Sequence, residues 1–219
     1  MRRVIGPLVF GVVGVAILVS LGTWQLQRLA LKEAKIAEIE AMIGAAAVAL
    51  PAVVGPGDRY RAVTVAGVLT GEAVYKLDSL RGQGPGRRVI AVLETEGRRV
   101  MVDLGILPEG DTVTLAGRIS LTGNLDMPQE TDSYTPAPDG DLWFARDVPA
   151  MAATLKAEPT LIVAGGPVVD GIVAVPVDTS SIPNDHWNYA LTWFSLALVW
   201  FVMTLAWMWR IRRQNQRAG

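Results

Sequence analysis

The sequence contains no cysteine and only one histidine, His186. Without cysteine the chain cannot form disulfides, thiolate zinc sites or cysteine-based copper sites. A single histidine excludes multi-histidine metal sites, and its position beside an apolar run excludes a Ser-His-Asp triad buried within a domain. The carboxylates are numerous, but their spacing selects no catalytic pair. The sequence therefore offers no recognisable catalytic set.

Charged residues are missing from two long stretches, residues 4–24 and 187–209. At about 1.5 Å per residue, either stretch can cross the roughly 30 Å hydrocarbon core of a bilayer as a helix. We expect two transmembrane helices, and we expect the first to be retained because its apolar run exceeds a typical signal-peptide core. Small residues let membrane helices approach closely, so we expect the two spans to pack together. The close-approach face predicted on the first span consists of Gly11, Gly14, Ala16 and Ser20.

The two tails lack acidic residues but contain six arginines, which gives them a charge of +6. The other fourteen basic residues and all 21 acidic residues lie between the spans, which leaves that segment at −7. Basic flanking segments stay in the cytoplasm under the positive-inside rule, so both termini are expected there and the acidic domain on the other side. An acidic domain is also a poor match for the phosphates of nucleic acid, which excludes that class of partner.

The middle of the chain predicts a mainly β domain. Residues 25–44 have apolar positions at helical spacing among charged ones, which indicates a helical stalk. Residues 45–56 contain two prolines and are typical of a linker. Alternating, valine-rich runs punctuated by Gly, Pro and Asp then predict strands. These strands are expected at residues 61–69, 73–78, 88–94, 98–107, 112–120, 142–147, 160–164 and 172–177.

Three further segments complete this domain: a glycine-rich hairpin loop at residues 81–88, a long surface loop at 122–141 and one short helix at 149–158. Asp103 lies within an apolar strand pattern, where we interpret it as a hydrogen-bonded structural carboxylate rather than a catalytic one. The predicted fold class is membrane α+β, with two transmembrane helices flanking one mainly β extracytoplasmic domain. The expected boundaries are a tail at 1–3, a span at 4–24, a stalk at 25–44, the β domain at 45–186, a span at 187–209 and a tail at 210–219.

Polar and aromatic residues gather at the outer end of the second span. His186, Trp193, Trp200 and Trp207 follow at intervals of seven, which keeps them on one stripe of a helix, with Tyr189 nearby. One interpretation is a haem site, in which the imidazole binds iron and the aromatic rings contact the porphyrin. The other is an interfacial aromatic belt combined with helix packing, since Trp and Tyr collect at the membrane surface in unrelated proteins.

Residues 21–29 and residues 183–194 form two blocks with fixed spacing, and together they resemble the signatures of the Surfeit-locus family of cytochrome c oxidase assembly factors. Residues 21–29, Leu-Gly-Thr-Trp-Gln-Leu-Gln-Arg-Leu, are similar to the family's Gly-x-Trp-Gln-x-x-Arg block. Residues 183–194 are similar to its Asn-x-His-x-x-Tyr-Ala-x-x-Trp-Phe block, and the two-span layout agrees over nearly the full chain. Weaker likenesses occur at residues 59–67 and 102–108. In the latter, Leu104 and Ile106 replace the arginine and tryptophan usual in the family.

The resemblance implies an integral membrane protein that helps build a haem-copper oxidase, at the insertion of haem a into the catalytic subunit. Because no Arg- and Ser-rich amphipathic presequence precedes the span that begins at Val4, we expect a bacterial inner membrane rather than a mitochondrial one. The resemblance implies His186 as the haem iron ligand, and the haem interpretation given above places Tyr189 and Trp193 beside the porphyrin. The other motif residues are expected to bind partners or support the structure; they are Trp24, Gln25, Arg28 and Asn184. The implied partners are the oxidase catalytic subunit, membrane lipid and, as a further candidate, haem A synthase. No enzymatic turnover is implied.

Two alternatives to a haem-handling chaperone stay open at this point. The first is a membrane scaffold that stabilises an oxidase assembly intermediate without binding haem. The second is a periplasmic sensor, although a sensor ordinarily carries a cytoplasmic output domain, and the tails of this sequence are short. Neither alternative uses His186 as a metal ligand.

Overall fold

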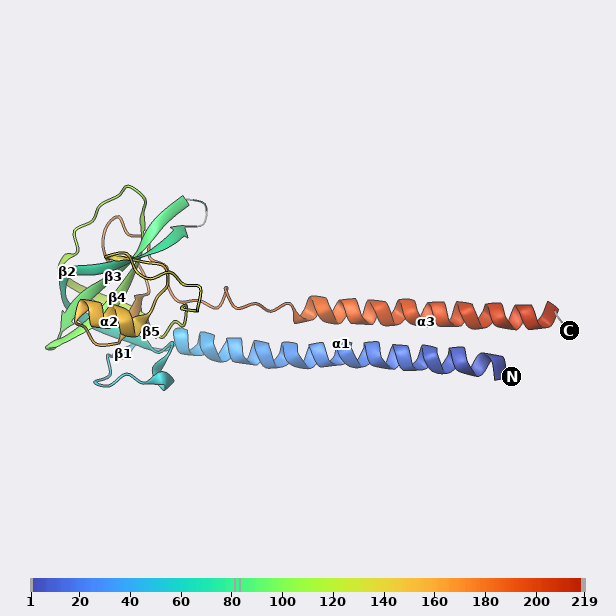
Figure 1. Cartoon of the computed structure of the whole chain (residues 1–219). Helices are drawn as coiled ribbons and strands as arrows, with labels where there is room; N and C mark the ends of the chain where they lie inside the picture. The colour runs from blue at the N-terminus through green and yellow to red at the C-terminus, as the bar shows by residue number, and fades with distance from the viewer. Residues whose placement is uncertain (1, 81, 83, 218–219) are drawn as a thin grey trace. The chain divides into compact units, whose positions relative to one another are not determined.

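The computed structural model describes residues 2–80, 82 and 84–217 and divides the chain into two compact units. One unit comprises Met1–Glu38 and Ser180–Gly219, and the other comprises Ile39–Thr179. The first contains most of helix α1 (Arg2–Ile43) and all of helix α3 (His186–Arg217), and the second contains the strands (Figure 1). The predicted fold class is confirmed: an apolar helix at each end of the chain flanks a mainly β domain.

The strands of the second unit form a sheet that closes on itself. β2 (Ala62–Leu80) pairs with β3 (Gly84–Thr95), and β3 pairs with β4 (Arg98–Pro108). β4 pairs in parallel with β7 (Leu161–Ala164), which pairs with β5 (Ala116–Asp126). β5 then pairs with the first half of β2, which completes a barrel. The short elements that flank this ring are β1 (Val48–Ala49), a 3-10 helix (Pro56–Asp58), β6 (Leu142–Trp143) and α2 (Val148–Leu155).

A bulge in β2 allows the barrel to close. The register between β2 and β3 shifts between Leu69 and Ala73, and Gly71 there has φ 88°, a value that residues with a Cβ rarely adopt. Residues just before the bulge pair with both β5 and β3, while those after it leave β5 and pair with β3, and Tyr75 and Lys76 also pair with β6. One core fills the barrel with valines and leucines such as Val63 and Leu93. A second core, which includes Met151 and Trp143, packs α2 against the outside of the sheet.

Several sequence predictions in this domain need correction. Residues 61–69 and 73–78 form one strand, because the bulge bends β2 without interrupting it. The strand expected at 112–120 runs instead over Ala116–Asp126 and includes the start of the expected loop at 122–141. Residues 172–177 contribute a single bridge between Val173 and Ile106 rather than a strand. Of the expected hairpin loop at 81–88, residues 84–88 belong to β3, while residues 81 and 83 lie outside the described residues.

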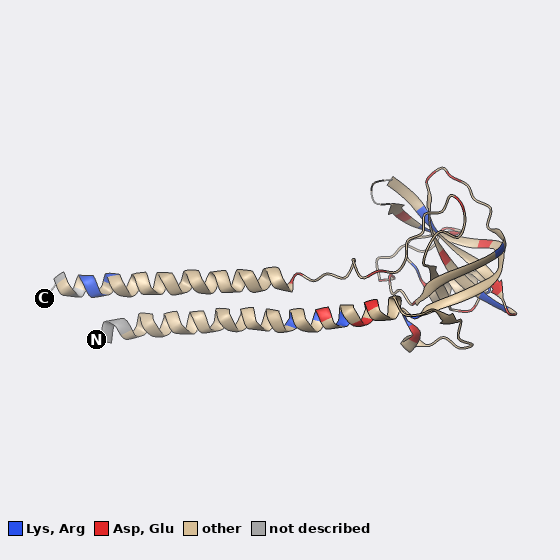
Figure 2. Ribbon diagram, turned by 180° about the vertical axis from the view of Figure 1, so that it is seen from behind, with Lys and Arg blue, Asp and Glu red and all other residues tan. Residues whose placement is uncertain are grey.

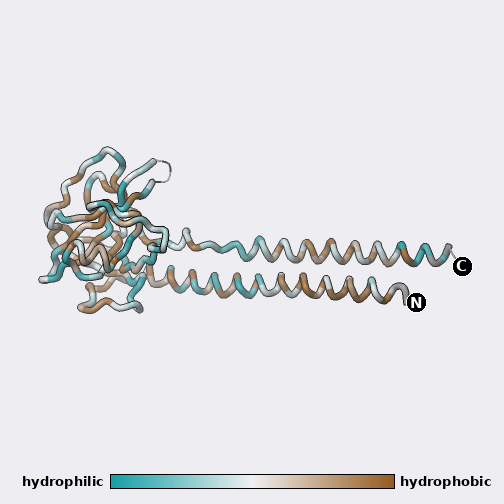
Figure 3. Tube along the Cα trace, in the orientation of Figure 1, coloured by the Kyte–Doolittle hydropathy of each residue, from teal (hydrophilic) through white to brown (hydrophobic). Residues whose placement is uncertain are grey.

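Two helices are long and apolar enough to cross a membrane, Ile5–Ile43 and His186–Gln214. Their apolar stretches are visible as brown tube in Figure 3, and in Figure 2 the middle of each helix is tan, the colour of uncharged residues. The expected stalk is the continuation of α1, because α1 runs without interruption from Arg2 to Ile43. These two helices fit a membrane protein.

Within the first unit, glycines of α1 receive larger side chains of α3. A Cβ added at Gly11 would collide with Thr204, one at Gly14 with the indole of Trp200, and one at Gly22 with the ring of Phe194. Phe10 also contacts Trp200, with 5.2 Å between ring centroids. The two helices therefore pack together as expected, because the glycines of α1 let its backbone come close to the side chains of α3.

The predicted close-approach face was only half right. Gly11 and Gly14 face α3, but Ala16 and Ser20 are exposed. Gly22 completes the interface instead, because the positions that meet a partner helix recur at intervals of three and four residues, and Gly11, Gly14 and Gly22 fit that period.

Candidate functional site

The two sequence blocks described above, residues 21–29 and 183–194, are joined by a hydrogen bond. Nδ1 of His186, the first residue of α3, lies 2.8 Å from Oε1 of Gln25 in α1. Both side chains are half-buried. Gln25 lies three residues beyond Gly22 on the same face of α1, and the close approach at Gly22 brings the two helices near enough for this contact.

This hydrogen bond determines which nitrogen of the His186 imidazole keeps a lone pair that could bind a metal ion. An amide oxygen can only accept, so Nδ1 of His186 carries the proton and donates to Gln25. In a neutral imidazole the other nitrogen, Nε2, then has a free lone pair. Histidines that bind metals typically donate their second ring N–H to an oxygen acceptor, which orients the ring and raises the basicity of the ligating nitrogen. The arrangement of Gln25 and His186 fits an iron ligand of this kind.

Tyr189 and Trp193 lie on the next two turns of α3. With about 100° of rotation per residue, they lie about 60° and 20° to one side of His186. Tyr189 is 56% exposed and Trp193 is half-buried, so the phenol projects away from α1 while the indole lies nearer to the helix contact. The predicted residues His186, Tyr189 and Trp193 therefore share one surface of α3, along a flank of the helix.

The remaining motif residues do not join this surface. Trp24 is exposed on α1, and the guanidinium of Arg28 lies 5.5 Å from the centre of its ring. Asn184 is half-buried, and its Oδ1 has no hydrogen-bond partner among the described residues. Trp24 and Arg28 thus present an exposed cation–aromatic pair, which suits contact with lipid headgroups or another protein rather than with His186.

A cluster of charged side chains surrounds Asp103 in the β domain, and its contacts define the structural role of Asp103. Asp103 is fully buried, and its Oδ2 accepts a hydrogen bond of 2.9 Å from Arg88 and lies 3.4 Å from Nη1 of Arg146. Its Oδ1 accepts the backbone N–H of Gly105 at 3.1 Å. Asp103 is therefore the hydrogen-bonded structural carboxylate that the sequence predicted.

The partners of Asp103 are themselves paired with other carboxylates. Nε of Arg88 lies 2.9 Å from Oδ2 of Asp78, and Nη2 of Arg146 lies 2.6 Å from Oε1 of Glu130. Burial raises the pKa of Glu130, but the hydrogen bonds from the side chain and backbone of Arg146 outweigh burial, so this pKa lies below its usual value. Sequence reasoning missed Arg88 and Arg146, because nothing in their spacing connects them with Asp103.

The fold and this site define a class of protein: a two-helix membrane protein with a β-barrel domain between its spans and one oriented histidine at the start of the second span. Comparison with known proteins then places the chain, since residues 12–198 match the SURF1 family. The chain belongs to this family, whose members are known as oxidase assembly factors. These names indicate an assembly factor rather than an enzyme.

Individual relatives agree with this assignment. The chain is 27% identical over 214 residues to Surfeit locus protein 1 of Mus musculus, a match that covers 81% of this chain and 67% of the relative. It is 29% identical over 197 residues to a SURF1-like protein of the bacterium Rickettsia felis, covering 82% and 87% of the two chains. A SURF1-like protein of Monosiga brevicollis is 27% identical over 210 residues, covering 81% and 78%.

Two positions depart from the family pattern quoted above. The sequence resemblance singled out Leu104 and Ile106 as departures, and both are buried in this structure. Leu104 belongs to the core inside the barrel, and the backbone of Ile106 exchanges hydrogen bonds with that of Val173. In this chain the two positions therefore contribute apolar packing, not a charge or an indole.

Proposed function

We propose that this protein assists the assembly of a haem-copper cytochrome c oxidase by holding haem a before the haem enters the catalytic subunit. The observation that carries the proposal is the hydrogen bond from His186 to Gln25, which joins the two family motifs and leaves Nε2 of His186 free to bind iron. When bound, haem a would supply the iron that accepts this nitrogen. The protein's own task is to hold, orient and release the group, with no turnover.

The surrounding residues support this role. Gln25 holds the imidazole ring in one orientation and one tautomer. Tyr189 and Trp193 offer aromatic faces on the side of α3 next to His186, where a flat porphyrin can lie. One histidine ligand holds haem less firmly than two, which suits a protein that must pass its cargo to the catalytic subunit. Haem A synthase is a candidate donor of the group.

The test is whether the protein acquires haem a. The full-length protein should be purified in mild detergent from cells that produce haem a and from matched cells that cannot. Because His186 is the one histidine of the chain, we expect an absorption spectrum of histidine-ligated haem a from the first cells only. A preparation from haem-a-producing cells with no porphyrin absorbance would contradict the proposal.

A scaffold that stabilises an assembly intermediate without haem is the second candidate. The packing of Trp200 against Gly14 favours it, because this tryptophan of the aromatic stripe already has a structural role between the spans. The exposed pair of Trp24 and Arg28 offers such a scaffold a contact surface. A protein that promotes oxidase assembly while remaining free of haem would support this candidate.

We further propose that the protein lies in a bacterial inner membrane with both termini in the cytoplasm and the β domain in the periplasm. The charge of +6 on the tails and −7 between the spans supports this orientation under the positive-inside rule. A reporter that is active only in the periplasm should be inactive when fused after Gly219 and active when inserted in the β domain. Activity of the C-terminal fusion would contradict the orientation.

A further inference from the structure

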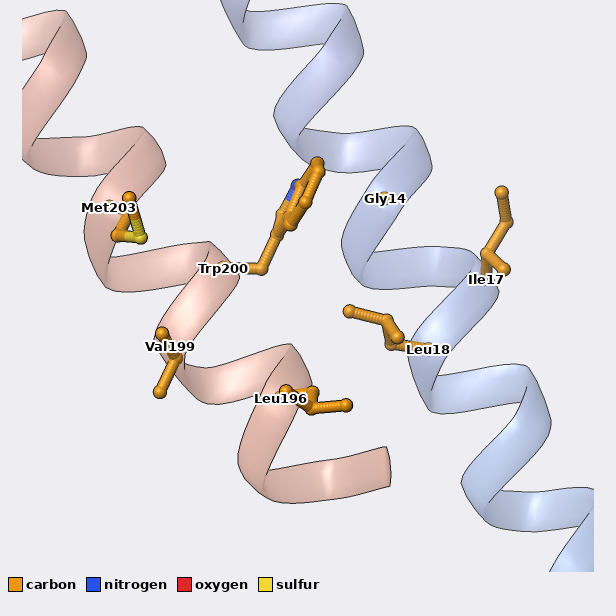
Figure 4. A pocket seen from close by; sticks show the side chains of 7 residues that line it. All are labelled: Gly14, Ile17, Leu18, Leu196, Val199, Trp200 and Met203. Carbon is orange, nitrogen blue, oxygen red and sulfur yellow. The ribbon is translucent and has the colours of Figure 1, made fainter. Parts of the chain in front are cut away.

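An apolar groove lies between the two spans, beyond the aromatic residues that follow His186. Its volume is about 360 Å³. Both helices line it, and Figure 4 shows the lining side chains on α1 and α3. The lining residues are Gly14, Ile17, Leu18, Leu196, Val199, Trp200 and Met203.

The groove continues the surface that begins at His186. With about 100° per residue, Tyr189, Trp193, Leu196, Trp200 and Met203 all lie to the same side of His186 within an arc of about 100°. Along the helix axis, the groove begins about 15 Å from His186 at Leu196 and extends to about 25 Å at Met203. A ligand held at His186 that extends along this flank therefore passes the two aromatic residues and reaches the groove.

The lining and the volume of the groove suit an apolar chain of small-molecule size. The lining residues named above are all uncharged, and the volume lies within the range of about 300–1,000 Å³ that is usual for small-molecule sites. The indole of Trp200 projects from α3 toward Gly14 and occupies the space beside it (Figure 4).

We propose that this groove holds the isoprenoid tail of haem a, an inference that rests on the function proposed above. Haem a differs from haem b in a long apolar tail attached at the ring edge. A ring bound through His186 presents its tail at high effective concentration to any site that the tail can reach, which favours it over untethered lipid chains. The groove therefore gives the protein a means to select tailed haems over haem b.

The experiment compares three haems on the full-length protein in lipid nanodiscs. Haem b lacks the tail, haem o carries the tail without the formyl group, and haem a carries both, so haem o against haem b isolates the tail. Lipid is as apolar as the groove, and the gain comes from close packing alone. We therefore expect haem o and haem a to bind about threefold to tenfold more tightly than haem b in titrations followed by the Soret band.

A matched pair of variants tests the groove itself. Val199 and Val202 are equally exposed on α3, at 55% and 54%, but only Val199 lines the groove. Val199→Trp should fill the groove and reduce the affinity for haem o to that for haem b, without changing haem b binding. Val202→Trp should leave the affinities for both haems unchanged.

Other results would contradict either the groove as the site of the tail or the proposed function. Equal binding of the three haems, with His186 required, would refute the groove as a tail site and leave the proposed function intact. No haem binding at all would refute the proposed function. A Val199→Trp variant that retains its preference for haem o, or that weakens haem b equally, would also overturn the assignment of the groove to the tail.

Discussion

Replacing His186 with alanine is expected to remove nearly all copurified haem, with at least about a 100-fold loss of haem affinity in titration. The loss is large because the chain has one histidine, so no neighbouring imidazole can take its place. Removing the hydrogen-bond acceptor with Gln25→Leu should weaken binding by roughly 10–100-fold, the usual cost of losing an orienting partner of a metal ligand. Both effects are measured from the Soret absorbance of purified protein.

Two controls test whether the loss of haem binding is specific to His186 and Gln25. Asn188→Ala changes an exposed residue two positions after His186 and should leave haem binding unchanged. Once His186 is alanine, Gln25→Leu should have no further effect, because Gln25 acts through the imidazole. If His186→Ala retains the haem content and spectrum of the unaltered protein, His186 is an interfacial residue and the scaffold candidate stands.

Replacing Arg88 with methionine should produce the largest loss of stability in the β domain, about 3–5 kcal/mol. Arg88 is buried and donates to both Asp103 and Asp78, so its removal leaves the fully buried Asp103 with its weaker contact to Arg146. An uncompensated buried charge accounts for a loss of this size. Urea denaturation of the full chain in detergent, followed by hydrogen exchange in β3 and β4, measures it.

The matched control is Arg61→Met. Arg61 pairs with Asp58 at 2.8 Å, but its side chain is half exposed, and surface ion pairs contribute only about 0–1 kcal/mol. Adding Asp103→Asn to the Arg88→Met variant should restore part of the lost stability, because it removes the unpaired charge. Equal losses from Arg88→Met and Arg61→Met would show that the cluster is not a structural centre of the barrel.

The local features of this fold could be predicted from the sequence, whereas the contacts between distant residues could not. Hydropathy and charge are properties of consecutive residues, and they indicated both long apolar helices and the β class. Barrel closure depends on the bulge near Gly71, which looks like an ordinary turn in the sequence. The ion cluster depends on Arg88 and Arg146, which lie 15 and 43 positions from Asp103.

In the candidate site, too, the individual residues could be predicted from the sequence but their contacts could not. The sequence pointed to His186 as a ligand and to Gln25 as a motif residue, but it gave no reason to pair them across 161 positions. It also placed Ala16 and Ser20 at the helix contact, whereas the register of α1 turns them away from α3. That register depends on side-chain packing against a second helix, and one helix alone does not reveal it.

The span of 161 positions between Gln25 and His186 also has a consequence for the order of events during biosynthesis. At a synthesis rate of about 5–20 residues per second, Gln25 leaves the ribosome roughly 8–32 seconds before His186 does. During that interval the barrel strands are synthesised. The acceptor oxygen of Gln25 has no hydrogen bond from His186 until the second helix follows. The oriented histidine is therefore among the last features of the protein to form, and a chain that stalls before its second helix lacks the hydrogen bond between Gln25 and His186.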